Sequence, residues 1–192
     1  MDEKTNNISK SQLKTKGIIF DKGVKITDRS NIDDLSSRGY GLIEENYLIL
    51  SFYEALYLND KKILEVSLQN NDSINFRDLL QYYEKINQNA WVNYLVYRDL
   101  RSRGYVVRGG FGSGIDFRIY ERGSYGKNVA STLILITQEG RPLSIDYLTS
   151  TMKQCQSQKK ALVLAVMNRR GEIVYYSVSK LNFHKGNSNV QI

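Results

Sequence analysis

The chain has 192 residues, of which 41% are apolar and 24% are charged. This length suits one large domain or two small ones, and the composition supports packed cores rather than a disordered chain. The polar first residues and the absence of an apolar run of about 18 residues predict a cytoplasmic protein without a signal peptide or membrane span. With one Cys and one His, neither an internal disulfide nor a zinc-type cluster is expected.

The net charge of +7 is unevenly divided along the chain. Residues 1–86 carry 12 Lys/Arg and 14 Asp/Glu, a balance of −2, whereas residues 87–192 carry 15 and 6, a balance of +9. A basic excess in one part is typical of a surface that binds a polyanion, most often nucleic acid. The same charge also suits a solvated face or contact with an acidic subunit.

The first part predicts a small α+β domain over 16–87, after a mobile tail over 1–15 that lacks hydrophobic periodicity. Turn residues around Gly23 predict a hairpin, and Ser51 with Glu54 three residues later has the spacing of a capping box. The expected strands cover 17–20, 24–27, 47–50 and 62–66, and the expected helices cover 28–38, 51–58 and 75–87. Asn87–Asn89 is a polar stretch between two helical patterns and is the expected domain boundary.

The second part, 88–192, predicts an α/β domain. A helix begins near Trp91 and ends before Gly104 with a basic last turn, which suits the helix dipole. A glycine-rich turn, 109–114, predicts a flexible hairpin, and two continuous apolar runs predict strands buried on both faces. The expected strands cover 105–107, 116–120, 132–137, 161–166 and 173–178, with a helix over 143–155. The predicted fold of this part is a mixed sheet flanked by helices.

The order YRDLRSRGYVV (97–107), a glycine turn, and DFRIYERG (116–123) resembles the catalytic domain of the archaeal tRNA-intron splicing endonucleases. The segment LSFYEALYL (50–58) resembles the same family. That resemblance implies that the C-terminal α/β domain is nuclease-like. It further implies metal-independent and cofactor-free cleavage of RNA by the ribose 2′-hydroxyl, which leaves a 2′,3′-cyclic phosphate and a 5′-hydroxyl. It also implies that Tyr120 stands at the position of the proton acceptor and Lys160 at that of the cation beside the phosphate.

The third residue of the family site is a histidine that donates a proton, and its position falls on Val129 or Ala130. Neither side chain can carry a proton. The one histidine, His184, lies beyond the last expected strand, where a surface residue is the favoured interpretation over a relocated acid. Loss of a general acid lowers a rate by roughly a hundredfold to ten-thousandfold. The sequence therefore resembles the structural subunit of the crenarchaeal heterotetrameric enzymes, with Tyr120 and Lys160 as vestigial positions.

This resemblance implies a homologous catalytic subunit and precursor tRNA, cleaved at bulge-helix-bulge sites, as partners. Expected RNA contacts come from Lys153, which stands where the family has an RNA-binding arginine, and from a set of arginines. The arginines are Arg101, Arg103, Arg108, Arg118 and Arg122. The last strand predicts an intersubunit edge formed by Val174, Tyr175, Tyr176, Ser177 and Val178. The family docks an acidic loop into a basic cleft, but the loop 168–172 is basic, so which subunit donates that loop stays open.

Three other functions fit parts of this pattern. A stand-alone RNA-binding protein would use the arginines on phosphates, and an active metal-independent RNA endonuclease would need another proton donor. A metal-dependent DNA nuclease would use Asp116 as its first ligand. Its second carboxylate is missing, since 132–137 contains none.

Overall fold

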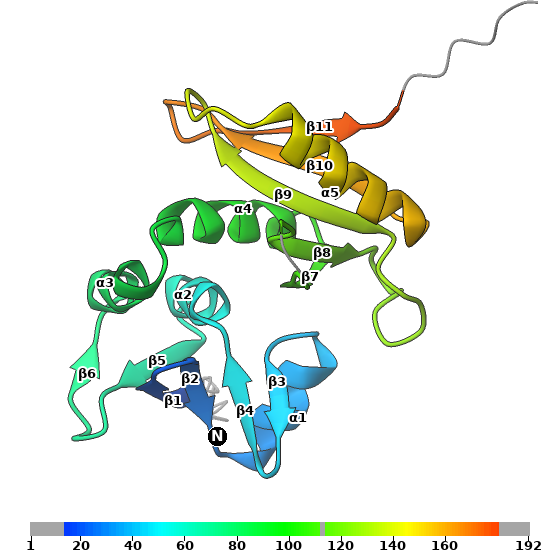
Figure 1. The fold of residues 1–192 in the computed structure, drawn as a ribbon. Coiled ribbons are helices and arrows are strands. Elements are labelled where there is room, and N and C mark those ends of the chain that lie inside the picture. Colours follow the sequence, from blue (N-terminus) through cyan, green and yellow to red (C-terminus); the bar gives the residue numbers. More distant parts are fainter. Residues whose placement is uncertain (1–13, 112–113, 181–192) are drawn as a thin grey trace, which may run out of the picture. The chain divides into compact units, whose positions relative to one another are not determined.

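The computed structural model describes residues 14–111 and 114–180 (Figure 1). Residues 1–13, which form most of the predicted tail, and His184 lie outside this part of the chain. The described residues form two compact units, divided between Tyr97 and Arg98 within helix α4 (Ala90–Ser102). The domain boundary that the sequence places at 87–89 stays a prediction. None of the described helices is long and apolar enough to span a membrane.

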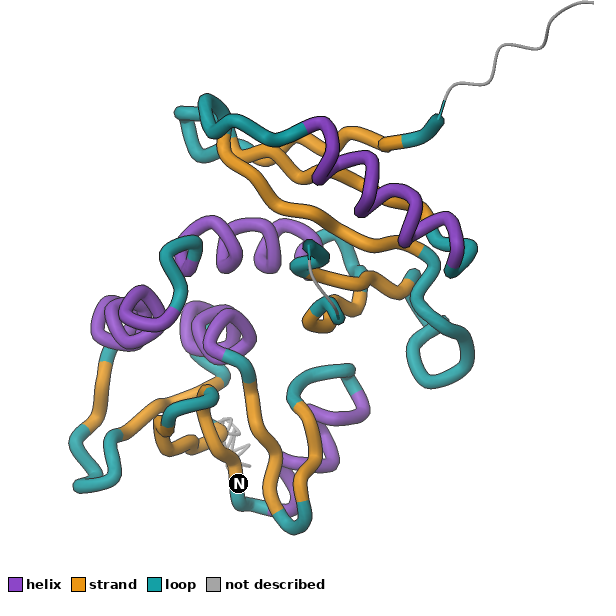
Figure 2. The backbone as a smooth tube through the Cα atoms, in the orientation of Figure 1, coloured by secondary structure: helices purple, strands orange, loops and turns teal. Residues whose placement is uncertain are grey.

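The first unit contains a six-stranded mixed sheet in the order β3-β4-β2-β1-β5-β6 (Figure 2). Its strands are β1 (Thr15–Phe20), β2 (Gly23–Ile26), β3 (Leu42–Glu44), β4 (Tyr47–Leu50), β5 (Leu64–Ser67) and β6 (Ser73–Ile74). The predicted hairpin is confirmed, because β1 and β2 pair antiparallel, while β1 and β5 pair in parallel. The sequence missed β3 and β6, which are too short to show an alternating pattern.

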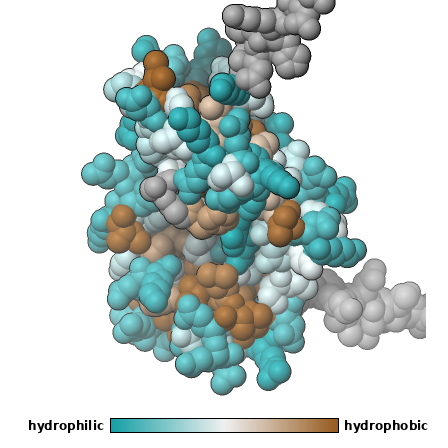
Figure 3. Space-filling view, turned by 45° about the vertical axis from the view of Figure 1, so that its right-hand side comes forward, coloured by the Kyte–Doolittle hydropathy of each residue, from teal (hydrophilic) through white to brown (hydrophobic). Residues whose placement is uncertain are grey.

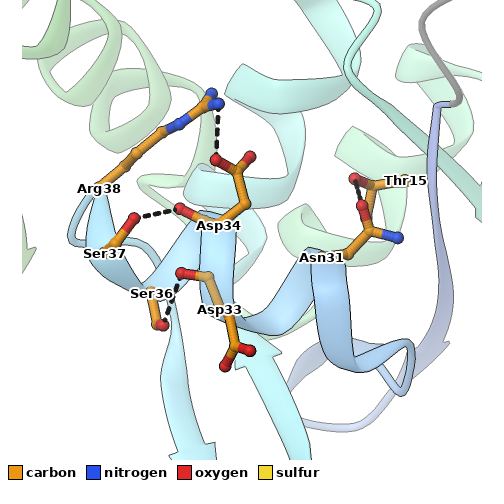
Figure 4. Close-up of polar contacts among 7 residues, drawn as sticks. All are labelled: Thr15, Asn31, Asp33, Asp34, Ser36, Ser37 and Arg38. Atoms are coloured by element: carbon orange, nitrogen blue, oxygen red, sulfur yellow. Dashed lines mark hydrogen bonds and ion pairs between the residues drawn. The ribbon is translucent and has the colours of Figure 1, made fainter.

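Three helices of the first unit are α1 (Arg29–Ser37), α2 (Phe52–Asp60) and α3 (Phe76–Ile86). Asp28 caps α1 by accepting a hydrogen bond from the Asn31 N–H at 2.9 Å. Asn31 in turn accepts a bond from the Thr15 hydroxyl at 2.9 Å, which ties α1 to β1 (Figure 4). At the other end, Arg38 pairs with Asp34 at 2.8 Å. The predicted helix over 28–38 is therefore confirmed.

The predicted capping box at the start of α2 is also confirmed. The Glu54 carboxylate accepts hydrogen bonds from the Ser51 N–H and hydroxyl, at 2.9 and 2.8 Å. It accepts a third from the Gly41 N–H at 3.1 Å, although Glu54 is only 3% exposed. Gly41 has φ +63°, and a Cβ there would lie 2.6 Å from Leu48, so the approach of this N–H to Glu54 requires glycine.

Aromatic rings hold the helices of the first unit together. Phe52 of α2 stacks on Tyr83 of α3 with ring centroids 5.5 Å apart. Tyr97 lies 5.0 Å from Tyr53 and 5.7 Å from Tyr57, so the first part of α4 packs on α2.

The second unit contains a five-stranded sheet in the order β11-β10-β9-β8-β7. Its strands are β7 (Val106–Gly109), β8 (Phe117–Tyr120), β9 (Thr132–Gln138), β10 (Ala161–Met167) and β11 (Ile173–Val178). Strands β9 and β10 are parallel and the other neighbours are antiparallel, which confirms the predicted mixed sheet. Helix α5 (Ile145–Ser157) makes the crossover between β9 and β10 and lies along one face (Figure 1).

The core between α5 and the sheet is built from Leu133, Leu135, Leu162, Ile115 and Cys155. Strand β9 is buried on both faces over Leu133–Leu135, as its apolar run predicts. The same prediction for β10 is wrong, because only Leu162 and Ala165 are fully buried in that strand. Strand β10 lies next to the edge strand β11, where the sheet is less well covered.

Candidate functional site

The strand register brings the ends of three neighbouring strands, β8, β9 and β10, together at one end of the second sheet. Thr132, the first residue of β9, pairs with Ile119 of β8 on one side and with Ala161 of β10 on the other. Tyr120 and Lys160 are the next residues beyond this row. Since neighbouring strands lie about 4.8 Å apart, the backbones of these two residues are roughly 10 Å apart, on the two strands that flank β9.

Tyr120 and Lys160 also point to the same face of the sheet. Leu133 of β9 is opposite Arg118 and Leu162, and it belongs to the core beneath α5. Side chains two residues apart on a strand share a face, so Tyr120 follows Arg118 and Lys160 precedes Leu162 on the α5 side. Tyr120 and Lys160 therefore lie at the same end of the second sheet and on the same face of it.

Phe111, in the glycine-rich turn between β7 and β8, lies against two cationic side chains, those of Lys160 and Arg118. The Lys160 Nζ is 4.9 Å from the centroid of its ring, and the Arg118 guanidinium carbon is 5.4 Å from it. The negative face of an aromatic ring attracts cations, so Phe111 restrains both side chains. The Arg118 Nε is buried and makes no hydrogen bond within the described part of the chain.

The chain reaches Lys160 through an unusual backbone conformation at the end of α5. Lys159 has φ +56°, the left-handed region that disfavours side chains with a Cβ. The Lys160 N–H donates to the Cys155 carbonyl at 3.0 Å, which closes the helix and directs the following residue into β10.

The loop between β8 and β9 contains Val129 and Ala130, the two positions to which the resemblance assigns a histidine. Val129 is 82% exposed and Ala130 is 1% exposed. In the same loop Tyr125 packs edge-on against Tyr120, with ring centroids 5.1 Å apart and planes at 90°. The loop therefore lies over Tyr120, and it presents an aliphatic side chain to solvent at position 129.

The predicted RNA-binding residues fall into different environments. Arg122 and Lys153 are exposed. Arg103 is engaged by Asp99, with a 2.8 Å ion pair. Arg101 is half-buried and donates to the Tyr105 carbonyl at 3.4 Å. Arg108 is only 6% exposed, which does not suit a phosphate contact at the surface.

The last strand leaves apolar side chains in solvent at the sheet edge. Val174 is 41% exposed and Tyr176 is 54% exposed, whereas Tyr175 is half-buried and points to the other face. Ser177 is exposed and Val178 packs against the α5 core. In the view of Figure 3, apolar side chains appear in separate groups among hydrophilic ones.

Asp116, the metal ligand of the DNA-nuclease alternative, has a structural role. Its carboxylate accepts a hydrogen bond from the Ile136 N–H at 2.7 Å, and its backbone N–H donates to Ile134 at 2.9 Å. Burial raises the pKa of this carboxyl above its ordinary value, and the bond from Ile136 opposes that shift. Within the described residues, no three His, Cys, Asp or Glu side chains gather as metal ligands.

Phe111 and Tyr125 are the residues that the sequence did not indicate as part of the site. Phe111 is the one large side chain in a run of small ones, GGFGSG, and that isolation is the signal that marks it. Tyr125 has no such signal, because its contact with Tyr120 depends on the path of a loop.

Comparison with known proteins identifies both parts of the chain. Residues 15–80 match the N-terminal domain of tRNA intron endonuclease, and residues 90–175 match its catalytic C-terminal domain. The tRNA-splicing endonuclease of Methanococcus maripaludis is 34% identical over 163 residues, which are 85% of this chain and 92% of that protein. The tRNA-splicing endonuclease of Pyrococcus furiosus is 33% identical over 147 residues, 77% of this chain and 84% of that protein. The chain belongs to the tRNA intron endonuclease family.

Proposed function

We propose that this chain is the structural subunit of a heteromeric tRNA-splicing endonuclease. In this role it supports excision of introns from precursor tRNA at bulge-helix-bulge sites by a homologous catalytic subunit, within a heterotetramer. The observation that carries the proposal is the side chain at the family's histidine position. Val129 and Ala130 are aliphatic, and an exposed valine has no group that can donate a proton to the departing 5′-oxygen.

The retained residues fit a subunit that binds RNA without cutting it. Tyr120 and Lys160 lie on either side of β9 at the same end of the second sheet, and Phe111 restrains Lys160 next to Arg118. Such a cluster supplies positive charge for backbone phosphates whether or not the chain cleaves them. Arg122 and Lys153 add exposed cations.

Among the described residues no strand pairs with the outer side of β11, and this edge of the second sheet supports an assembly with a second subunit. Strand β11 pairs with β10 on one side and is the last strand in the sheet order. Its exposed Val174 and Tyr176 side chains are apolar, which is unfavourable in water and favourable beneath a partner.

The proposal is tested by measuring assembly mass and cleavage of a bulge-helix-bulge RNA. The full chain is assayed alone, with a homologue that carries the histidine, and with the same homologue lacking it. We expect excision only with the intact homologue, in a complex that contains both chains. Metal-free excision by this chain alone, with a 2′,3′-cyclic phosphate product, would instead show an active endonuclease. Tight, salt-sensitive RNA binding without any association with the homologue would favour a stand-alone RNA-binding protein.

A further inference from the structure

A cavity of about 340 Å³ opens on the face of the second sheet that is opposite α5. Leu133 points toward α5, so its neighbours Thr132 and Ile134 point to the other face and line the floor of the cavity, with Thr132 half-buried and Ile134 fully buried beneath it. Ile119 and Val163, their partners on the adjacent strands, extend this floor. Ile134 and Ile119 are buried, so the accessible part of this floor is formed by the half-buried Thr132 and Val163. The volume is in the range of small-ligand sites, about 300–1,000 Å³.

One wall of the cavity is held rigidly by a network around Asp99. The Tyr175 hydroxyl donates to its carboxylate at 2.7 Å, and the Arg103 guanidinium donates to both oxygens at 2.8 and 3.3 Å. Arg103 also lies 5.5 Å from the centroid of the Tyr175 ring. Burial and the bond to Asp99 raise the pKa of Tyr175, so its phenol stays protonated and the network stays intact at neutral pH. This wall is preformed before any ligand arrives.

The mouth of the cavity is polar and lies at the end of the sheet where Tyr120 and Lys160 are found. Glu121 and Ser131 line it, and Glu121 directly follows Tyr120 in the chain. Both residues are exposed. An exposed carboxylate repels backbone phosphates, which is unexpected in a unit with a strong excess of positive charge. Its two acceptor oxygens suit a partner that offers two neighbouring N–H donors.

We propose that this cavity binds one unpaired base of the RNA, with guanine preferred. The inference rests on the proposed role in RNA processing, and it adds a base-reading site to it. A splayed-out base places its ring on the floor, and its Watson–Crick edge reaches the mouth. Guanine offers the N1–H and the N2 amino group side by side to the two oxygens of Glu121, whereas uracil offers a single N–H.

The test uses guanosine 5′-monophosphate and uridine 5′-monophosphate as probes and follows the amide NMR signals of the full-length chain. We expect saturable shifts centred on Ser131 and Thr132, with guanosine 5′-monophosphate bound roughly tenfold more tightly, as for a bidentate base contact. Glu121→Gln should remove this preference by weakening only the guanine nucleotide. Thr132→Phe, which fills the floor, should abolish binding of both nucleotides.

Glu139→Gln is the matched control, because Glu139 is an exposed glutamate near the opposite end of β9 and its loss changes the net charge equally. It should leave both affinities unchanged. If Glu121 acts only by repelling phosphate, Glu121→Gln would tighten both nucleotides, which would overturn the proposal. Equal affinity for the two nucleotides, or no saturable binding by a chain whose NMR spectrum shows it folded, would also overturn it. These readouts need neither a partner nor cleavage, so failed excision on mixing would count against the subunit role alone.

Discussion

The resemblance assigns the proton acceptor to Tyr120 and the proton donor to Val129 or Ala130, neither of which can donate a proton, while Tyr125 of the same loop packs against the Tyr120 ring. A phenol without a matched acid contributes little to cleavage, because both proton transfers occur in the reaction. Its ring can still fill space against Tyr125. Tyr120 therefore has a structural role that does not depend on cleavage by this chain.

The proposed structural role of Tyr120 predicts the effect of Tyr120→Phe in the assembled enzyme. If this chain has the proposed structural role, the substitution in it should change the rate of intron excision by less than about twofold, because the hydroxyl that is removed would take no part in the reaction. The equivalent change in the catalytic homologue is the control, and it should lower the rate roughly a hundredfold or more. Excision is measured under single-turnover conditions with the complex at saturating concentration. A hundredfold loss from the substitution in this chain would show that its own tyrosine takes part in the reaction.

Asp116 supports a prediction about stability. Asp116→Ala removes the acceptor for the Ile136 N–H and should lower the free energy of unfolding by about 1–3 kcal/mol. Asp116→Asn keeps an acceptor oxygen and should lower it by less. Urea denaturation of the three proteins measures the difference, and an equal loss in both variants would contradict the role assigned to the hydrogen bond.

The same residue sets the sign of a pH effect. Burial raises the pKa of the folded Asp116 carboxyl above its ordinary value of 3.8, so the folded state binds the proton more tightly than the unfolded state. Its contribution to stability is therefore greatest below pH 3.8 and falls as the pH rises through the raised pKa. Asp116→Asn should lack this fall, so the difference in unfolding free energy between wild type and variant should change with pH in that window. Parallel pH profiles would contradict the assignment.

Among the structural elements, the start of α2 depends on a single carboxylate. Glu54 accepts hydrogen bonds from two backbone N–H groups and one hydroxyl while almost fully buried. Glu54→Ala should lower the free energy of unfolding by about 2–4 kcal/mol, because two buried donors lose their acceptor. The control is Glu84→Ala on the exposed side of α3, which should change it by less than about 0.5 kcal/mol. Chemical denaturation followed by far-UV circular dichroism checks both values, and similar losses in the two variants would exclude a special role for Glu54.

Much of the secondary structure could be predicted because its signals are local. Asp28, Ser51 and Asn75 are polar caps that begin helices, and the apolar run at 132–137 matches β9 almost residue for residue. The short edge strand β3 carries no such pattern, since Leu42–Glu44 is exposed along its length. The incomplete burial of β10 also escaped prediction, because it depends on its place in the sheet.

The site was predictable only in part, for a related reason. Tyr120 and Lys160 follow from the family resemblance, and they end or precede strands that the sequence indicates. Their position at the same end and on the same face of the sheet depends on the register of β8, β9 and β10, which no single segment encodes. The contacts of Phe111 and the cavity behind Ile134 arise from side chains distant in sequence, so only the folded chain reveals them.

For the whole molecule, the strongest prediction concerns the exposed edge of the second sheet. Tyr176 is 54% exposed on β11, so Tyr176→Lys should change the stability of the isolated chain little. If β11 meets a partner, the buried lysine would leave an unpaired charge in the interface, and the assembly should dissociate at micromolar concentration. Light scattering coupled to size-exclusion chromatography, with the homologue present, measures the mass.

Ile145→Lys provides the matched control for this interface, because Ile145 is 80% exposed and lies on α5 rather than on β11. Both substitutions replace an exposed apolar side chain by the same cation, so a general effect of charge on association would act on both. Loss of assembly with Tyr176→Lys alone would place the partner at the β11 edge. An unchanged mass for both variants would mean that the subunits meet elsewhere, and the exposed residues of β11 would need another explanation.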